Sequence, residues 1–208
     1  MNALSRPAAE HPRAGARRAQ ILAAAADCFR SHGFHGASIA SISAAAGMSA
    51  GHIYHYFDNK EAIIAGIVAQ DLDRALDVTA QLRSSPDVLD ALLGAVADGV
   101  ERSLDAEAAA LKVEIAAEAS RNERVAAIVR AADARGIASL VETLRSMRRA
   151  RGHGDDDAAL EGMAEVIAAL FDGLTVSGIR NPGLDREAAA RLIRRIVASF
   201  ADEAVEAA

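Results

Sequence analysis

Apolar residues recur along nearly the whole chain at the three- and four-residue spacing of an α-helix. The clearest case lies near the C-terminus, where Leu184, Ala188, Leu192, Ile196 and Phe200 follow one another at intervals of four. No segment alternates apolar and polar residues, and no run rich in Val, Ile and Thr is bounded by turns. Strands therefore have no obvious place, and the sequence predicts an all-α fold.

A chain of 208 residues is long enough for one full domain and a smaller one. Residues 1–12 have no periodicity and contain two prolines, so we predict a disordered arm there. A three-helix head over residues 13–60 and a helical body over residues 61–208 follow. About nine helices are expected, over residues 13–31, 38–46, 49–56, from 58, from 85, about 105–120, 122–149, one ending near 178 and one from 185.

Capping and turn residues predict where these helices begin and end. The expected N-caps are Ser38, Ser49, Asp58 and Ser85, the last of which stands before a proline at the first helical position. Gly33 is expected to end the first helix, because glycine adopts the left-handed conformation at little cost. Gly136 lies within the long helix predicted over residues 122–149 and is a place where that helix can bend.

The charge of the chain is unevenly distributed between head and body. Residues 1–60 contain six Lys and Arg against three Asp and Glu, which gives a net charge of +3. The whole chain carries −6 at pH 7, so residues 61–208 carry −9. A basic head attached to an acidic body is the electrostatic pattern of a small DNA-binding unit on a larger domain.

Several classes of protein are disfavoured by what the sequence lacks. Cys28 is the single cysteine and stands in an apolar helical run, so the chain has no internal disulfide and no cysteine pair for a metal. His52 and His55 have no third ligand at a useful spacing, and we expect no metal and no cofactor. No nucleophile stands near a base, so an enzyme is not expected. The absence of a signal peptide and of an uncharged apolar run predicts a cytoplasmic protein without a membrane partner.

The middle of the head has the pattern of a helix-turn-helix, two short helices joined at a glycine. In the second helix His52, His55 and Tyr56 share one face, which can meet the major groove of DNA. Ile53 and Phe57 share another face and can seat this helix on the rest of the head. Their expected packing partners are Phe29, Ile39, Ile42 and Met48.

The segment from Gly47 to Glu61, which contains Tyr-His-Tyr-Phe-Asp-Asn-Lys-Glu, resembles the TetR family signature around the recognition helix. Upstream positions that also resemble this family are Gly33, Phe34, Ser38, Ile39, Ile42 and Ala45. The resemblance covers residues 13–64, whereas the body resembles the family only in helix count and rhythm. It implies an all-helical, DNA-binding transcriptional regulator that responds to a small molecule.

The resemblance also implies roles for individual residues of the head. The DNA-binding positions are Ser38, Ser49, Ala50, Gly51, His52, Tyr54, His55, Tyr56 and Lys60. Those expected to contact the DNA backbone are Ser38, Tyr54, His55 and Lys60, and those expected near base edges are Ala50, Gly51, His52 and Tyr56. At Ala50 the family often has a longer polar side chain, and alanine can offer only an apolar contact to a thymine methyl group.

For four residues of the head, a role in packing or solvation remains an alternative to DNA contact. Tyr54 and Tyr56 could be packing residues, and Arg17 and Arg18 could simply form a solvated helix face. None of these alternatives changes the predicted fold. They decide only which side chains are available to DNA.

In the body, the family resemblance implies a small-molecule pocket among the fourth to eighth helices. Candidate wall residues, each of which could instead be ordinary core, are Leu92, Val96, Leu111, Ile115, Ile137, Leu144 and Phe171. Glu114 and Glu118 are four residues apart and either present a carboxylate inward or face water. The chain has no tryptophan and few aromatics, which favours a compact or aliphatic ligand.

The last two helices each carry a continuous apolar stripe, and the resemblance implies that they pair with a second copy as a four-helix bundle. The expected interface residues are Ile167, Leu170, Leu174, Leu192, Ile196 and Phe200. A two-fold dimer presents two heads to two DNA half-sites. We therefore expect a repressor that binds a palindromic operator as a homodimer and is released by a small molecule. The alternative is a helical small-molecule-binding or interaction protein with a degenerate DNA-binding head.

Overall fold

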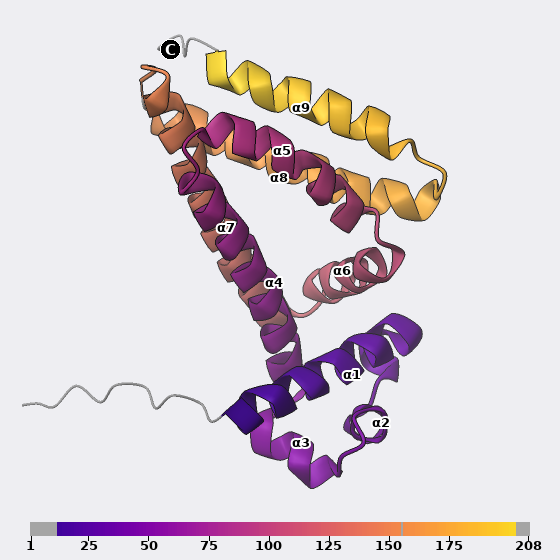
Figure 1. Cartoon of the computed structure of the whole chain (residues 1–208). Coiled ribbons are helices and arrows are strands. Elements are labelled where there is room, and N and C mark those ends of the chain that lie inside the picture. The colour runs from indigo at the N-terminus through magenta and orange to yellow at the C-terminus, as the bar shows by residue number, and fades with distance from the viewer. Residues whose placement is uncertain (1–11, 155, 203–208) are drawn as a thin grey trace, which may run out of the picture. The chain divides into compact units, whose positions relative to one another are not determined.

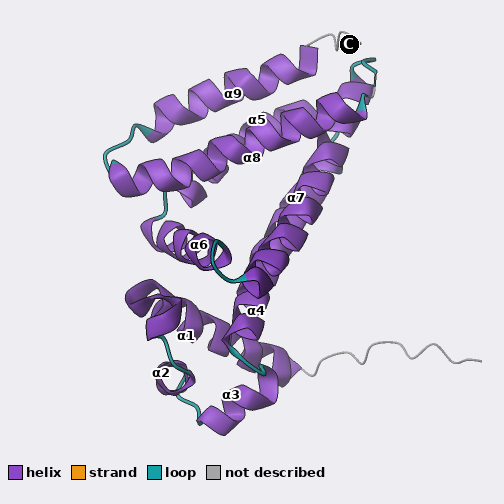
Figure 2. Cartoon of the chain, turned by 180° about the vertical axis from the view of Figure 1, so that it is seen from behind, coloured by secondary structure: helices purple, strands orange, loops and turns teal. Residues whose placement is uncertain are grey.

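The computed structural model describes residues 12–154 and 156–202, and every regular element in this part of the chain is an α-helix (Figures 1 and 2). Its nine helices are α1 (Pro12–Gly36), α2 (Ile39–Ala45), α3 (Ala50–Tyr56), α4 (Lys60–Arg83), α5 (Val88–Ser103), α6 (Ala106–Ala119), α7 (Glu123–Ala150), α8 (Asp157–Arg180) and α9 (Arg186–Asp202). The all-α prediction is confirmed. Except for Pro12, where α1 begins, the predicted arm lies outside the described residues.

The chain folds into two compact units that divide after Ile67, inside α4. The division lies seven residues beyond the predicted boundary at residue 60. Ile63, Ile64 and Ile67 are each 5% exposed or less. A Cβ atom at Gly66 would lie 2.8 Å from the Leu22 side chain, so α4 approaches α1 closely here. The first two turns of α4 therefore add to the core of the first unit.

The first unit packs three helices and the beginning of α4 around one apolar core. Its fully buried residues come from all four segments and include Ile21, Ala25, Phe29, Ile42, Ile53, Phe57 and Ile63. Gly33 has φ 70° and ψ 168°, which interrupts the helical geometry of α1. The predicted helix end at Gly33 is thus a kink, beyond which one more helical turn leads to α2.

The second unit is built from long amphipathic helices whose apolar stripes meet. α5 lies beside α8 and α9, and α7 packs on α6 and α8 (Figures 1 and 2). The shared core is formed by Val88, Leu92, Val96, Val100, Leu104, Val141, Leu144, Met147, Leu160, Met163, Ala164, Ile167, Ala190, Ile193, Val197 and Ala201. α7 runs unbroken through Gly136. The C-terminal half of its 28 residues contributes Val141, Leu144 and Met147 to this core.

A polar seam joins the C-terminal part of α4 to the middle of α7. Arg83 Nη1 donates to the carbonyl oxygen of Ser139 at 2.9 Å and to Thr143 Oγ1 at 3.0 Å. The hydroxyls of Thr79 and Ser139 lie 2.7 Å apart. Thr143 is completely buried, so this contact is costly to break without a replacement partner.

Two of the predicted N-caps are wrong by one or two residues. Asn59 rather than Asp58 caps α4, because its Oδ1 accepts the amide of Ala62 at 2.8 Å. Asp87 rather than Ser85 caps α5, where it accepts the amide of Asp90 at 3.0 Å. Each segment offers two residues of capping type within three positions, and the position at which the following helix begins decides which of them serves.

Candidate nucleic-acid interface

A tight turn at residues 46–49 joins α2 to α3. Gly47 has φ +63°, the left-handed conformation that ends many helices. Its amide donates to the carbonyl of Ala44 at 3.1 Å, and the amide of Met48 donates to the carbonyl of Ser43 at 2.9 Å. A Cβ at Gly47 would meet nothing within 4 Å, so backbone conformation, not space, requires glycine here.

The N-caps predicted for the two short helices are confirmed. Ser38 Oγ accepts the amide of Ser41 at 3.0 Å, and Ser41 Oγ accepts the amide of Ser38 at 2.9 Å, which completes a capping box. Ser49 Oγ accepts the amide of His52 at 3.2 Å. Both helices have only seven residues, so these bonds satisfy a large share of their free amides.

One face of α3 is buried and the other is open to solvent. Ile53 is fully buried and Phe57, directly after the helix, is 3% exposed, as the pattern predicts. Ala50, Gly51, His52, Tyr54 and His55 are exposed, and Tyr56 is half-buried. Tyr54 is 54% exposed, so the packing interpretation is wrong for this residue.

Three rings gather on the open face of α3. The imidazole of His52 stacks on the ring of Tyr56, with centroids 5.5 Å apart and an interplanar angle of 17°. The imidazole of His55 meets the same ring edge-on at 5.0 Å and 81°. These residues, called the ring cluster below, orient one another before any partner binds.

Lys60 is held inside the head by its own chain. Its Nζ donates to the carbonyl oxygens of Phe34 at 2.5 Å and Ala37 at 2.9 Å, and it lies 4.3 Å from the centre of the Phe34 ring. Its expected contact with a DNA phosphate stays a prediction. These acceptors cannot be found from the spacing of residues, because they lie 26 and 23 residues earlier in the chain.

Side chains of α1 hold the C-terminal ends of both short helices. Arg18 Nη1 donates to the carbonyl of Tyr56 at 3.2 Å, and its Cζ lies 4.6 Å from the centre of the Phe57 ring. Gln20 Nε2 donates to the carbonyl of Ala46 at 2.8 Å. Arg17 Nη1 in turn donates to Gln20 Oε1 at 2.9 Å. The solvated-face interpretation is therefore wrong for Arg18, although Arg17 is exposed.

In the second unit most of the predicted pocket residues contribute to packing. Leu92, Val96 and Leu144 belong to the buried core, and Ile137 and Phe171 pack against it. The other two lie on α6, where Ile115 is buried and Leu111 is half-buried; their role as ligand contacts stays a prediction.

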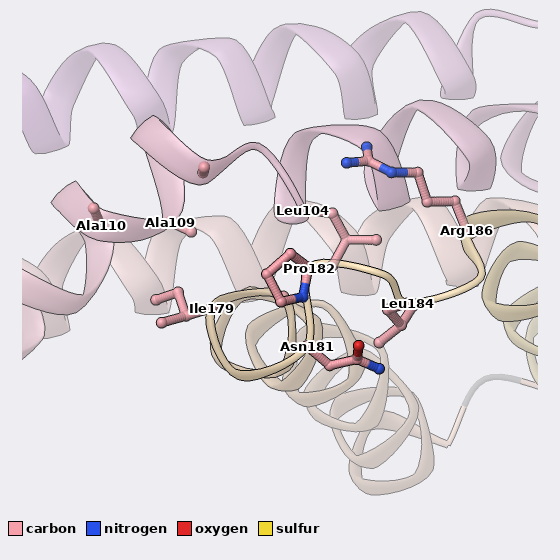
Figure 3. Close-up of a pocket in the computed structure, with 10 residues that line it drawn as sticks. Leu104, Ala109, Ala110, Ile179, Asn181, Pro182, Leu184 and Arg186 are labelled. Carbon is pink, nitrogen blue, oxygen red and sulfur yellow. The ribbon is translucent and has the colours of Figure 1, made fainter.

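A cavity of about 380 Å³ lies elsewhere in the second unit, where the α5–α6 and α8–α9 connections meet (Figure 3). It is lined by Leu104, Ala106, Ala109, Ala110, Gly178, Ile179, Asn181, Pro182, Leu184 and Arg186. None of the seven predicted pocket residues is among them. The guanidinium at its edge, that of Arg186, pairs with Glu101.

Glu118 is a buried carboxylate at the end of α6. Its side chain is 1% exposed and accepts hydrogen bonds from Arg121 Nε at 3.2 Å and Asn122 Nδ2 at 2.9 Å. Asn122 also caps α7, so Glu118 organises the turn between two helices. Of the two alternatives for this glutamate, the inward orientation is correct.

The predicted dimer residues differ widely in exposure. Ile167 is buried in the core, whereas Leu192 on α9 is 58% exposed. Leu170, Leu174, Ile196 and Phe200 are half-buried. Three further apolar residues of α8 are exposed and were not among those expected, namely Val166, Val176 and Ile179. Their spacing could have revealed them, because α8 has a second stripe besides the one that enters the core.

Comparisons with known proteins identify relatives over both units. A family model described as bacterial regulatory proteins, tetR family, matches residues 21–67, and one described as BetI-type transcriptional repressor, C-terminal, matches residues 85–202. The HTH-type transcriptional regulator UidR of Escherichia coli strain K12 is 38% identical over 113 residues, which are 54% of this chain and 57% of that protein. The chain thus spans little more than half the length of this curated relative.

Two further relatives match more of the chain. The HTH-type transcriptional repressor AcnR of Corynebacterium jeikeium is 24% identical over 158 residues, 76% of this chain and 79% of that protein. The solved structure of Salmonella enterica GusR is 30% identical, with a TM-score of 0.74, and the alignment covers 97% of this chain and all of that one. The likeness therefore extends through both units.

Proposed function

Since the chain belongs to the TetR family of bacterial regulatory proteins, we propose that it represses transcription as a homodimer on a palindromic operator and leaves that operator when a small molecule binds. Regulators of this family act by binding DNA, not by catalysis. We propose that this chain acts in the cytoplasm. The observation that carries the proposal is the open face of α3, with its ring cluster, on a helix whose other face is buried.

We assign base recognition to the exposed residues of α3 and backbone contacts to the residues around them. Ala50, Gly51, His52 and Tyr56 are proposed to approach base edges, and Ser38, Ser49, Tyr54, His55 and Lys60 to contact the backbone. The capping geometry supports Ser49, because its Oγ accepts the amide of His52 and can still donate its proton to a phosphate oxygen. Ser38 Oγ would have to exchange its hydrogen bond to Ser41 Oγ for one to phosphate. Lys60 would have to exchange carbonyl partners for a phosphate.

A seam on α8 supports the homodimer. Gly162, Val166, Ala169, Gly173 and Val176 are all exposed and follow one another at alternating intervals of four and three. This spacing is that of a coiled-coil seam, and small residues allow a second helix to approach closely. A Cβ at Gly162 or Gly173 would meet nothing within 4 Å, so the seam has free space above it.

A second copy explains this apolar surface better than a bilayer does. By length and composition α8 alone, among the described residues, could cross a membrane, with only 22% of its most apolar window buried. Its exposed surface also carries four acidic residues, Asp157, Glu161, Glu165 and Asp172. Carboxylates are costly in hydrocarbon but are well placed at the rim of a helical interface.

The effector is proposed to bind in the second unit and to be compact or aliphatic. Candidate positions are the half-buried Leu111, Ile137 and Phe171, and the cavity at the α5–α6 and α8–α9 connections, whose volume suits a small molecule. Coupling to DNA would pass along α4, which begins in the first unit and is held to α7 by the polar seam. The effector need only favour the arrangement that fits DNA poorly.

Selection of bound duplexes from randomised DNA tests the proposed recognition. The wild-type protein should enrich a palindrome whose half-sites are about one helical turn apart. His52→Ala and Tyr56→Ala should change the preferred bases, at about 1–3 kcal/mol per disturbed contact. The control Tyr54→Phe should weaken all sites equally. Enrichment of no sequence by the wild-type protein would refute the proposal.

Sedimentation of paired charge variants tests the dimer. Val176→Glu places a carboxylate in the α8 seam and should yield monomers that bind the operator weakly. Val113→Glu introduces the same charge at an exposed valine of α6 and should remain dimeric. Monomeric wild-type protein, or equal behaviour of the two variants, would contradict the assignment of α8.

A further inference from the structure

The carbonyl that ends α3 lies under a guanidinium from α1. α3 has seven residues, and the chain becomes extended at Phe57, with φ −144° and ψ 121°. The amide of Phe57 donates to the carbonyl of Ile53. The carbonyls of the residues after Ile53 have no partner within the helix and must be satisfied by other groups. The carbonyl of Tyr56, the last of them, accepts from Arg18.

Tyr56 connects this contact to the ring cluster. The backbone of Tyr56 is held by Arg18, and its ring stacks on His52 and meets His55 edge-on. The guanidinium also covers the ring of Phe57, the residue that anchors α3 in the core. One side chain of α1 therefore fixes both the end of α3 and the tyrosine around which the cluster is arranged.

We infer that Arg18 is a positioning residue for operator selection: it sets the orientation of α3 and, through Tyr56, of the ring cluster that faces the bases. This inference rests on the proposed function. It adds a specificity determinant that lies outside the recognition helix. A small rotation of α3 would move all three rings together and alter the set of bases within their reach.

The contact requires arginine in particular. A planar guanidinium can lie face-down on an aromatic ring while an N–H in its own plane donates to a carbonyl. A lysine at this position keeps the charge but has no planar guanidinium, so it cannot stack on the Phe57 ring while an in-plane N–H donates to the carbonyl of Tyr56. Arg18→Lys therefore removes the planar geometry of the contact and keeps its positive charge. Arg18→Ala removes both.

The test compares Arg18→Lys with Arg13→Lys, the same substitution at an exposed arginine of α1. Randomised half-sites are selected with both variants and the wild-type protein, and the salt dependence of binding is measured on the preferred site. For Arg18→Lys we expect relaxed base preference, with the ratio of specific to non-specific affinity lower by about tenfold or more, and an unchanged salt slope. Arg13→Lys should select the wild-type site.

Base preference separates positioning from general stability. A head that is merely less stable binds every sequence more weakly by one factor, since only the folded fraction binds, and the ratio between sites stays constant. Selection of the wild-type site by Arg18→Lys with an undiminished ratio would overturn the inference. So would an Arg18→Ala variant whose salt slope falls by about 0.9 per half-site with unchanged preference, because Arg18 would then be a phosphate contact.

The same experiment distinguishes this inference from the proposed function. A wild-type protein that enriches no site refutes both. A wild-type protein that enriches a palindrome, together with an Arg18→Lys variant that enriches the same one equally well, refutes the role of Arg18 alone.

Discussion

The two units of this protein differ in where their predicted functional residues lie. In the first unit the residues expected to meet DNA are mostly exposed, and those expected to pack, such as Ile53, are buried. In the second unit the residues expected to meet a ligand are mostly core, and of the large apolar residues that are most exposed only Leu192 was predicted to lie at an interface. On a short helix with one buried face, a residue either packs in the core or faces solvent. On a long apolar helix with several neighbours, an apolar residue can belong to the core, a pocket or an interface.

Leu144→Ala gives the sharpest test of this difference. Leu144 is fully buried in the core of the second unit, so we expect a loss of about 2–5 kcal/mol in the free energy of unfolding. Denaturant titration followed by circular dichroism measures it. Val113→Ala removes apolar atoms from a residue that is 39% exposed and should cost less than about 0.5 kcal/mol.

A small loss at Leu144 would instead favour the ligand-wall interpretation, since a wall residue borders space that a ligand fills. In that case the variant should keep its stability and lose its response to the effector. The statement that the predicted ligand residues of the second unit are mostly core would then be wrong for Leu144.

Lys60→Ala tests the one residue of the first unit that was expected to contact DNA but whose charged group bonds within the head. Loss of two charge-assisted hydrogen bonds and the contact with Phe34 should cost about 2 kcal/mol without any DNA present. Hydrogen exchange should show faster opening of α1 and α2, with the core of the second unit unchanged.

The salt dependence of DNA binding distinguishes the two roles of Lys60. If Lys60 contacts only phosphate, the stability of the free protein should be unchanged and the salt slope should fall by about 0.9 per half-site. Lys60→Arg serves as the control, since it keeps the charge while changing the shape of the donor.

Gly99→Ala tests the packing of Phe171, one of the predicted pocket residues. A Cβ at Gly99 would lie 2.6 Å from Cε1 and 2.9 Å from Cζ of the Phe171 ring. We expect a loss of about 1–2 kcal/mol by thermal or denaturant unfolding, because the ring must move. A gain in stability would mean that the Phe171 ring has free space into which it can move. Such free space is expected around a residue that lines an adaptable pocket.

Gly94→Ala, in the same helix, is the matched control. A Cβ at Gly94 would meet nothing within 4 Å, and the residue is exposed. Alanine is the better helix former, so this variant should gain about 0.5–1 kcal/mol. The difference between the two glycines isolates the contact with Phe171 from the helix propensity that both substitutions change.

Short-range features were the most predictable from sequence. Ser38 and Ser49 cap the short helices as expected, because a serine three residues before a free amide needs only local geometry. The caps of α4 and α5 were misplaced because Asp58 and Asn59, or Ser85 and Asp87, are both competent. Only the packing of the helix that follows distinguishes them.

By itself the sequence determined the helical fold, the helix-turn-helix and the two faces of α3, because each follows from residue spacing within one or two turns. The tertiary structure decided the partners of Arg18 and Lys60, the inward turn of Glu118 and which stripe of α8 enters the core. The acceptors of Arg18 and Lys60 lie 38, 26 and 23 residues away in the chain. Glu118 bonds to neighbours in sequence, but its burial depends on the helices around it. A long donor side chain bonds to whichever carbonyl the fold brings within its reach. The spacing of residues along one helix does not determine which carbonyl that is.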